Sequence, residues 1–120
     1  MREKIQGLIG LGDVLVEQKK WEDAKKYYTQ AQALDDKNSL VYYKIGRIFY
    51  LQRDFKQAIS YNKKASELEP GYYFYLYTIA LMYKESGNNE EAKNYINQAL
   101  ILSPNAPEVL ELSWEIGGGS

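Results

Sequence analysis

The side chains that could take part in chemistry are carboxylates, lysines, serines and tyrosines, because the chain contains no cysteine and no histidine. Disulfides and thiolate metal sites are therefore excluded, and the most common metal ligand and general base is missing. Adjacent acidic residues occur at Asp35-Asp36 and Glu90-Glu91. We interpret the first pair as part of a loop and the second as the first turn of a helix, where the helix dipole favours negative charge. The sequence predicts a protein that is not an enzyme and binds no metal or cofactor.

Two other motifs suggest ligands but favour a structural interpretation. Three glycines occur in Gly7-Leu-Ile-Gly10-Leu-Gly12, yet a phosphate loop requires a preceding strand and a different order of glycines. Paired lysines occupy helical, solvated positions, and 15 basic against 16 acidic residues leave a net charge of −1, which does not indicate nucleic-acid binding. The pairs are Lys19-Lys20, Lys25-Lys26 and Lys63-Lys64.

The composition predicts one globular domain. A chain of 120 residues with 45% hydrophobic residues can bury one continuous core, and we expect residues 1–116 to do so. No apolar run approaches the length of a membrane span, and Met1–Lys4 does not open a signal peptide, so we expect a cytoplasmic protein without membrane insertion. We expect Gly117–Ser120 to be a flexible linker or a remnant of protein engineering.

Residues of one class recur along the chain at a spacing of 34 positions. The stretch Tyr42–Pro70 shows the pattern best, as two amphipathic helices with a break at Gln52-Arg53-Asp54. Small residues and large apolar residues both follow the spacing, which indicates a repeat architecture. The series are Gly12/Gly46/Ala80, Leu8/Tyr42/Leu76, Leu11/Ile45/Ile79, Leu15/Phe49/Tyr83, Ala24/Ala58/Ala92, Ala31/Ala65/Ala99 and Leu34/Leu68/Leu102.

With these series, residues 5–106 resemble the tetratricopeptide repeat family, in which a large residue, Leu-Gly, an aromatic, Ala, an aromatic, Ala and Pro follow one another. The resemblance implies an all-α fold, a right-handed α-solenoid of three helix-turn-helix repeats plus a C-terminal capping helix. The repeats are expected at about 5–38, 39–72 and 73–106, and the capping helix at about 107–116.

Local signals predict where helices begin. Trp21 is expected to open the second helix of the first repeat. Asp54 with Gln57, and Asn88 with Glu91, have the spacing of N-terminal capping pairs.

The capping helix is expected to cover the apolar end of the stack. Asn105 is the predicted N-cap, and proline at position 107 is tolerated in the first helical turn. We expect Val109, Leu110 and Trp114 to form the inner face of this helix.

The resemblance also implies a binding site. In this family the first helix of each repeat lines a concave groove, and clustered exposed aromatics usually mark an interaction site. The alternatives are that some rings pack sideways against neighbouring helices or take part in oligomer contacts. The implied groove residues are Ile9, Asp13, Tyr43, Lys44, Arg47, Tyr50, Phe74, Tyr77, Leu81 and Lys84, to which the capping helix could add Glu108, Glu111, Leu112 and Glu115.

The charges refine the expected partner. Residues 39–72 carry a net charge of +3, and the capping helix carries three glutamates and no base. We therefore expect a groove that is positive in the middle, from Lys44 and Arg47, and negative at its C-terminal end. A partner protein or peptide with apolar anchors and an acidic group would complement it.

One well-known groove chemistry of the family is missing. The clamp that holds the carboxylates of chaperone tails needs basic residues where this chain has Ile9, Phe74 and Thr78, and asparagines where it has Asp13 and Lys44. The sequence therefore predicts a protein-interaction module without this clamp, present as a monomer or weak homo-oligomer. The alternative is an assembly element that self-associates through its end faces or by helix exchange.

Overall fold

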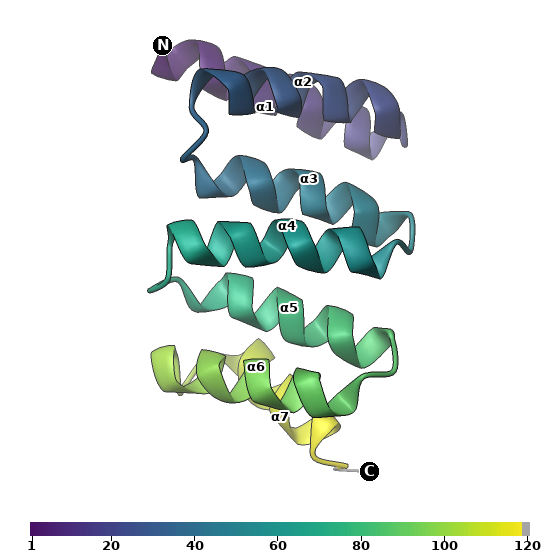
Figure 1. Cartoon of the computed structure of the whole chain (residues 1–120), viewed down its shortest axis with the longest axis vertical. Coiled ribbons are helices and arrows are strands. Elements are labelled where there is room, and N and C mark those ends of the chain that lie inside the picture. Colours follow the sequence, from purple (N-terminus) through teal and green to yellow (C-terminus); the bar gives the residue numbers. More distant parts are fainter. Residues whose placement is uncertain (119–120) are drawn as a thin grey trace.

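The computed structural model describes residues 1–118 of the chain, and these residues form seven helices and no strand. The helices follow one another without long loops, so each packs against the next (Figure 1). Their bounds are α1 Arg2–Glu17, α2 Trp21–Leu34, α3 Ser39–Leu51, α4 Phe55–Leu68, α5 Tyr73–Glu85, α6 Asn89–Leu102 and α7 Pro107–Ile116.

The helices form three antiparallel pairs that stack along one axis, with α7 at the end of the stack. The molecule measures 44 × 26 × 21 Å, and α1 and α7 lie at opposite ends of the long axis (Figure 1). The most extensive contacts join α1 to α2, α3 to α4 and α5 to α6. The predicted all-α solenoid of three helix pairs and a capping helix is confirmed.

The small residues lie where the two helices of a pair touch. The seven alanines of the repeated series have no exposed surface. A Cβ atom placed on Gly46 would lie 2.5 Å from Nδ2 of Asn62, so α3 and α4 can approach this closely only without a side chain at position 46. Gly12, in the same series, has the same packing role, because a Cβ atom there would overlap the Tyr28 ring.

The three turns inside the pairs share one backbone conformation. Lys19, Arg53 and Gly87 are spaced 34 residues apart and have φ angles of 61°, 65° and 89°. In each turn the next residue donates its backbone N–H to a carbonyl five positions earlier, at 2.8–2.9 Å. This is the Schellman end of a helix, which requires one left-handed residue.

The predicted caps of α4 and α6 are confirmed, whereas that of α7 is wrong. Asp54 accepts a hydrogen bond from the backbone N–H of Gln57, and Asn88 accepts one from Glu91. At α7 the N-cap is Ala106, which has an extended backbone directly before proline, and no side chain caps the helix. Asn105 lies one position too early for this role.

The prediction for the inner face of α7 is also wrong in part. Val109 and Leu112 are buried, but Leu110 is 48% exposed and Trp114 is 64% exposed. The latter two stand 34 residues after Leu76 and Ala80, which pack against α6. No helix follows α7 in the described residues, so this side of α7 has no partner within the pair.

Leu11 belongs to a repeated apolar series but is 50% exposed, although its equivalents Ile45 and Ile79 are buried. The reason is its place in the first helix of the stack, where no earlier pair covers it. Of the expected linker 117–120, Gly117 and Gly118 follow α7 in a turn, and residues 119–120 lie outside the described residues.

Candidate functional site

A hollow between α3 and α5 brings together six of the predicted groove residues. It encloses about 160 Å³. We call it the aromatic pocket. The predicted residues in its wall are Tyr43, Arg47, Tyr50, Phe74, Tyr77 and Leu81, and Thr78 and Met82 complete it.

Helical spacing explains why these side chains meet. Residues three or four positions apart share one face of a helix, so Tyr43, Arg47 and Tyr50 project from the same side of α3. Tyr77 and Leu81 do so on α5. The two rows face each other because α3 and α5 are the first helices of successive pairs.

The aromatic rings pack against each other and still keep exposed edges. The centroids of Tyr43 and Phe74 lie 5.5 Å apart in an edge-to-face arrangement, and those of Phe74 and Tyr77 lie 5.9 Å apart. All three side chains are half-buried, as is Tyr50. Packing between neighbouring helices therefore positions the rings, and part of each remains available at the surface.

A buried polar contact supports the pocket from below. The Thr78 hydroxyl donates a hydrogen bond to Oδ1 of Asn62 at 2.7 Å, and the Asn62 amide donates to the Ala58 carbonyl at 3.0 Å. Asn62 is fully buried. Neither Asn62 nor Met82 was predicted from the sequence. Asn62 could have been found, because it is an amide at the repeat position that Tyr28 and Ile96 occupy in the other two pairs, and it lies opposite Gly46.

Two predicted groove charges are used inside the protein. Nζ of Lys44 lies 3.1 Å from Oδ1 of Asp13, and the Tyr28 hydroxyl donates to the same oxygen at 2.5 Å. Burial, followed by this hydrogen bond, raises the pKa of Tyr28. Asp13 and Lys44 thus tie α1, α2 and α3 together at the groove surface, outside the aromatic pocket.

Arg47 differs from Lys44, because no ion pair of Arg47 occurs among the described residues. Its side chain is exposed and lines both the aromatic pocket and a second hollow of about 450 Å³ between α1 and α3. Glu17 borders the second hollow without reaching ion-pair distance. Arg47 is the cation at the rim of the aromatic pocket.

Two tyrosines near the pocket donate hydrogen bonds to carboxylates. Tyr50 donates a hydrogen bond to Glu85 at 2.5 Å, and Tyr73 donates one to Glu108 of α7 at 2.6 Å. Burial, followed by the hydrogen bond to Glu85, raises the pKa of Tyr50 to about 12. Burial and the nearby glutamates of α7 raise the pKa of Tyr77.

The remaining predicted residues lie elsewhere. Ile9 packs with Ile5 and Val16 in the cluster between α1, α2 and α3, and only a small part of its side chain lines the hollow at the start of α1. Leu112 is buried too, because it faces α5 and α6. Lys84 lies at the far end of α5, where Nζ is 3.8 Å from Oε2 of Glu115.

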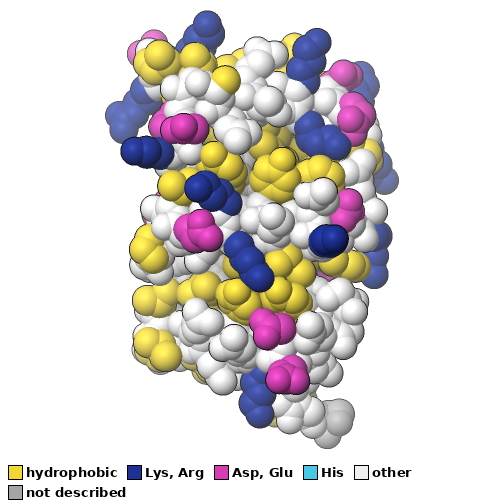
Figure 2. Space-filling model, in the orientation of Figure 1, with side chains coloured by type: hydrophobic (Ala, Val, Ile, Leu, Met, Phe, Trp, Pro, Cys, Tyr) yellow, Lys and Arg dark blue, Asp and Glu magenta, His cyan; other side chains and the backbone are white. Residues whose placement is uncertain are grey.

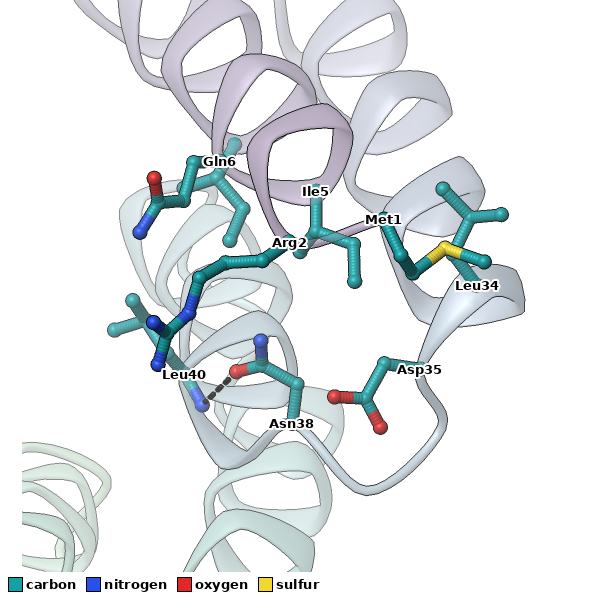
Figure 3. Close-up of a pocket in the computed structure, with 9 residues that line it drawn as sticks. Met1, Arg2, Ile5, Gln6, Leu34, Asp35, Asn38 and Leu40 are labelled. Atoms are coloured by element: carbon teal, nitrogen blue, oxygen red, sulfur yellow. Dashed lines mark hydrogen bonds between the residues drawn. The ribbon is translucent and has the colours of Figure 1, made fainter.

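A wider hollow lies at the beginning of the chain. It encloses about 600 Å³ between the start of α1, the end of α2 and the start of α3. Figure 3 shows the Arg2 side chain reaching across toward Leu40, with the Asp35 carboxylate on the other side of the opening. Asn38 accepts a hydrogen bond from the Leu40 backbone N–H.

The face formed by α2, α4 and α6, the second helices of the pairs, differs from the groove in its side chains. In Figure 2, lysine and arginine side chains are scattered over this face, and hydrophobic side chains gather near its middle. A hollow of about 480 Å³ between α4 and α5 contains Phe55, Ile59 and Tyr83. Nζ of Lys63 lies 5.5 Å from the centre of the Tyr83 ring.

Neither a metal site nor a membrane span was found in residues 1–118. These residues contain no group of three or more acidic side chains placed to hold a metal ion. None of their helices combines the length and hydrophobicity needed to cross a bilayer.

Solved structures with the same fold cover almost the whole chain. The first TPR of Spaghetti (RPAP3), bound to the HSP90 peptide SRMEEVD, has a TM-score of 0.87 and 22% identity, over 98% of this chain and 93% of that chain. The Yersinia enterocolitica type III secretion chaperone SycD, in complex with a peptide of the translocator YopD, has a TM-score of 0.82 and 22% identity, over 97% and 88%. The Arabidopsis OM64 TPR domain has a TM-score of 0.84 and 20% identity, over 98% of both chains.

Family models agree with the stacked helix pairs. Two models, both described as tetratricopeptide repeat, match residues 9–72 and residues 73–106. No curated protein sequence gives a significant match. The repeated small residues, the three helix pairs and these matches lead to one conclusion: the chain belongs to the tetratricopeptide repeat family.

Proposed function

We propose that this protein is a non-catalytic interaction module that holds a peptide or helix of a partner protein in the groove lined by α1, α3 and α5. The observation that carries the proposal is the aromatic pocket, in which four half-buried rings and Arg47 meet at the surface. Aromatic and arginine side chains dominate the binding energy of many interfaces.

The similar structures support this type of function. The TPR of Spaghetti and the chaperone SycD were both solved with peptides bound. A pocket of about 150 Å³ lined by apolar side chains holds a benzene molecule, so the aromatic pocket has room for one large apolar side chain of a partner.

A carboxylate clamp is not part of the proposal. Of the positions that would need a base, Ile9 and Thr78 are buried and Phe74 carries no charge. Asp13 and Lys44 stand where the clamp has asparagines, and they bind each other. The proposed partner is therefore held mainly by apolar contacts.

The test is a selection of peptides from a random display library on the immobilised protein, followed by calorimetric titration of the selected peptides. Tyr77→Ala should weaken binding by roughly 2 kcal/mol or more, the loss expected of a central interface aromatic. Lys93→Ala, on the exposed side of α6, is the control and should bind like the wild type. Melting temperatures of both variants show whether the fold is retained.

Equal affinities of the two variants would place the bound peptides on another face. Arg47→Ala gives an independent check, because this side chain is exposed and its removal leaves no buried gap. Selected peptides that ignore both Tyr77→Ala and Arg47→Ala would contradict the groove.

A second candidate function is self-association through the ends of the stack. Leu11 and Val14 at one end are 50% and 55% exposed, and Trp114 at the other end is 64% exposed. Sedimentation velocity over a wide range of concentrations tests this function. Assembly that Val14→Glu or Trp114→Glu abolishes would support it, and a monomer at every concentration would contradict it.

A further inference from the structure

We propose that the groove selects a peptide by the placement of its charges: one large apolar side chain in the aromatic pocket, an acidic group beside Arg47 on the α3 side, and a basic group beside Glu111 on the α7 side. This proposal rests on the proposed function and adds the chemistry of the partner. It adds a basic group to the expected partner with apolar anchors and an acidic group, and it places the two opposite charges on either side of the anchor.

Glu111 is placed by its neighbours on α7. Glu108, Glu111 and Glu115 are three and four positions apart and so lie on one face of the helix. Glu108 accepts a hydrogen bond from Tyr73, and Glu115 pairs with Lys84, so this face of α7 looks onto α5. Glu111 lies between these two contacts.

Tyr77 lies between the same two contacts on α5, since it follows Tyr73 by one helical turn and precedes Lys84 by two. Glu111 therefore faces the edge of the aromatic pocket that Tyr77 forms. The electrostatic influence of Glu111 on the Tyr77 hydroxyl agrees with this placement.

Arg47 lines the aromatic pocket, and Glu111 lies beyond the edge of the pocket that Tyr77 forms. Within residues 1–118, the other charged groups around the pocket have partners: Arg53 pairs with Glu85 at 3.6 Å, and Lys84 pairs with Glu115 at 3.8 Å. Arg47 and Glu111 are exposed and form no ion pair or side-chain hydrogen bond in this part of the chain. A partner can therefore pair with either charge without breaking an existing contact.

The stack sets the separation of the two charges. Arg47 is on α3 and Glu111 is on α7, with α5 between them. Helices that pack directly lie about 8–10 Å apart, and we take this spacing for each step because ring contacts join α3 to α5 and polar contacts join α5 to α7. Two such steps are roughly 16–20 Å, which an extended peptide spans with about five or six residues. An acid and a base about five residues apart, with the anchor between them, fit this distance.

The probes are fluorescein-labelled synthetic peptides of twelve residues with a glycine and serine background and one central leucine or phenylalanine. One set carries aspartate and lysine five residues apart on either side of the anchor, in both chain directions. The comparison sets carry two aspartates, two lysines or two serines at the same positions. Fluorescence polarisation with the full chain gives the affinities.

The mixed-charge peptide in one direction should bind about fivefold more tightly than the serine peptide, and high salt should reduce this advantage. Arg47→Glu should prefer the peptide with two lysines, and Glu111→Lys should prefer the peptide with two aspartates. Lys93→Glu and Glu67→Lys, on exposed sides of α6 and α4, are matched charge-reversal controls. They should rank the peptide sets by affinity in the same order as the wild type.

The outcomes separate the two proposals. Peptides that bind through the pocket, as shown by weaker binding to Tyr77→Ala, but with equal affinities across the charge sets would overturn the charge selection and leave the groove function intact. The charge selection would also be overturned, with the groove function left intact, if Arg47→Glu and Glu111→Lys rank the peptide sets by affinity in the same order as the wild type. Absence of binding by every set, or binding that Tyr77→Ala does not weaken, would overturn both.

Discussion

At the scale of single residues, the side chain that faces each small position decides how a helix pair is built. Tyr28 packs over Gly12 and sends its hydroxyl to Asp13, whereas Asn62 packs over Gly46 and supports Thr78 beneath the aromatic pocket. The equivalent contact in the third pair joins Ala80 and Ile96, which share an apolar cluster. One residue per pair thus determines whether the groove rests on a polar or an apolar support.

Gly46→Ala should destabilise the protein by about 1–3 kcal/mol, because the new methyl group would overlap the Asn62 amide. Gly10→Ala is the matched control: it lies inside α1, and a Cβ atom there would have no neighbour within 4 Å, so alanine should stabilise the helix by about 1 kcal/mol. Urea denaturation of both variants measures the two effects. Equal changes would contradict the packing of α3 on α4.

Tyr50 should make stability depend on pH in the alkaline range. Its pKa is about 12 in the folded protein and about 10 in an unfolded chain. The contribution of Tyr50 is therefore fully present below about pH 10 and is lost as the pH rises toward 12, since the unfolded chain releases the proton first. Urea midpoints of the wild type and Tyr50→Phe should converge between pH 9 and 12. A constant difference would argue against the Glu85 hydrogen bond.

At the scale of elements, the three turns inside the helix pairs share one backbone conformation but differ in the residue at its left-handed position. The left-handed position of the turn holds glycine only in the third pair, and lysine or arginine in the others. A side chain in this conformation is disfavoured by roughly 1–2 kcal/mol. The helices on either side must therefore hold Lys19 and Arg53 in place.

Exchanges at the turn position should act in opposite directions. Gly87→Ala should lower stability by about 1 kcal/mol, and Lys19→Gly should raise it by up to a similar amount, because only glycine adopts this conformation without strain. Thermal unfolding followed by circular dichroism measures both. A stabilising Gly87→Ala would mean that this turn is not left-handed in solution.

Two leucines of α7 provide a test of which side of this helix is buried. Leu112→Ala should cost about 2–5 kcal/mol, because the side chain fills the cluster with Leu76 and Ile96. Leu110→Ala, on the exposed side of the same helix, should change stability by less than about 0.5 kcal/mol. The free energies of unfolding distinguish this arrangement from one in which Leu110 faces inward.

At the scale of the whole molecule, the most extensive contacts join helices that follow one another in the chain, and smaller ones join the first helices of successive pairs and α7. Stability in such a solenoid is close to a sum of pair and interface terms, so the two ends are held by fewer interfaces than the middle. The aromatic pocket lies between the second and third pairs, which are supported on both sides. The aromatic pocket can therefore be rigid even if the two ends of the stack are less stable.

Native-state hydrogen exchange should therefore be slowest in α3, α4 and α5 and faster in the first half of α1, where Gly7 and Gly10 weaken the helix. Mass spectrometry of peptide fragments after deuterium labelling measures this gradient. Uniform protection along the chain would show that the whole stack opens as one unit.

The helix pairs and their internal contacts could be predicted from the sequence, because they depend on local spacing. The series of small residues placed Gly12 and Gly46 against the second helices, and the capping pairs at Asp54 and Asn88 placed the starts of α4 and α6. Each of these signals acts within one repeat of 34 residues. No knowledge of more distant neighbours was needed.

Only the tertiary structure decided what each surface residue faces. Ile9 resembled a groove residue by position, yet α3 covers it, whereas Leu110 and Trp114 resembled core residues and no helix covers them. Likewise, Asp13 and Lys44 are ordinary charges in the sequence and become a linked pair once α1 lies beside α3. Burial and charge pairing depend on the helix across the interface, and that neighbour is set by the stack and by its two ends.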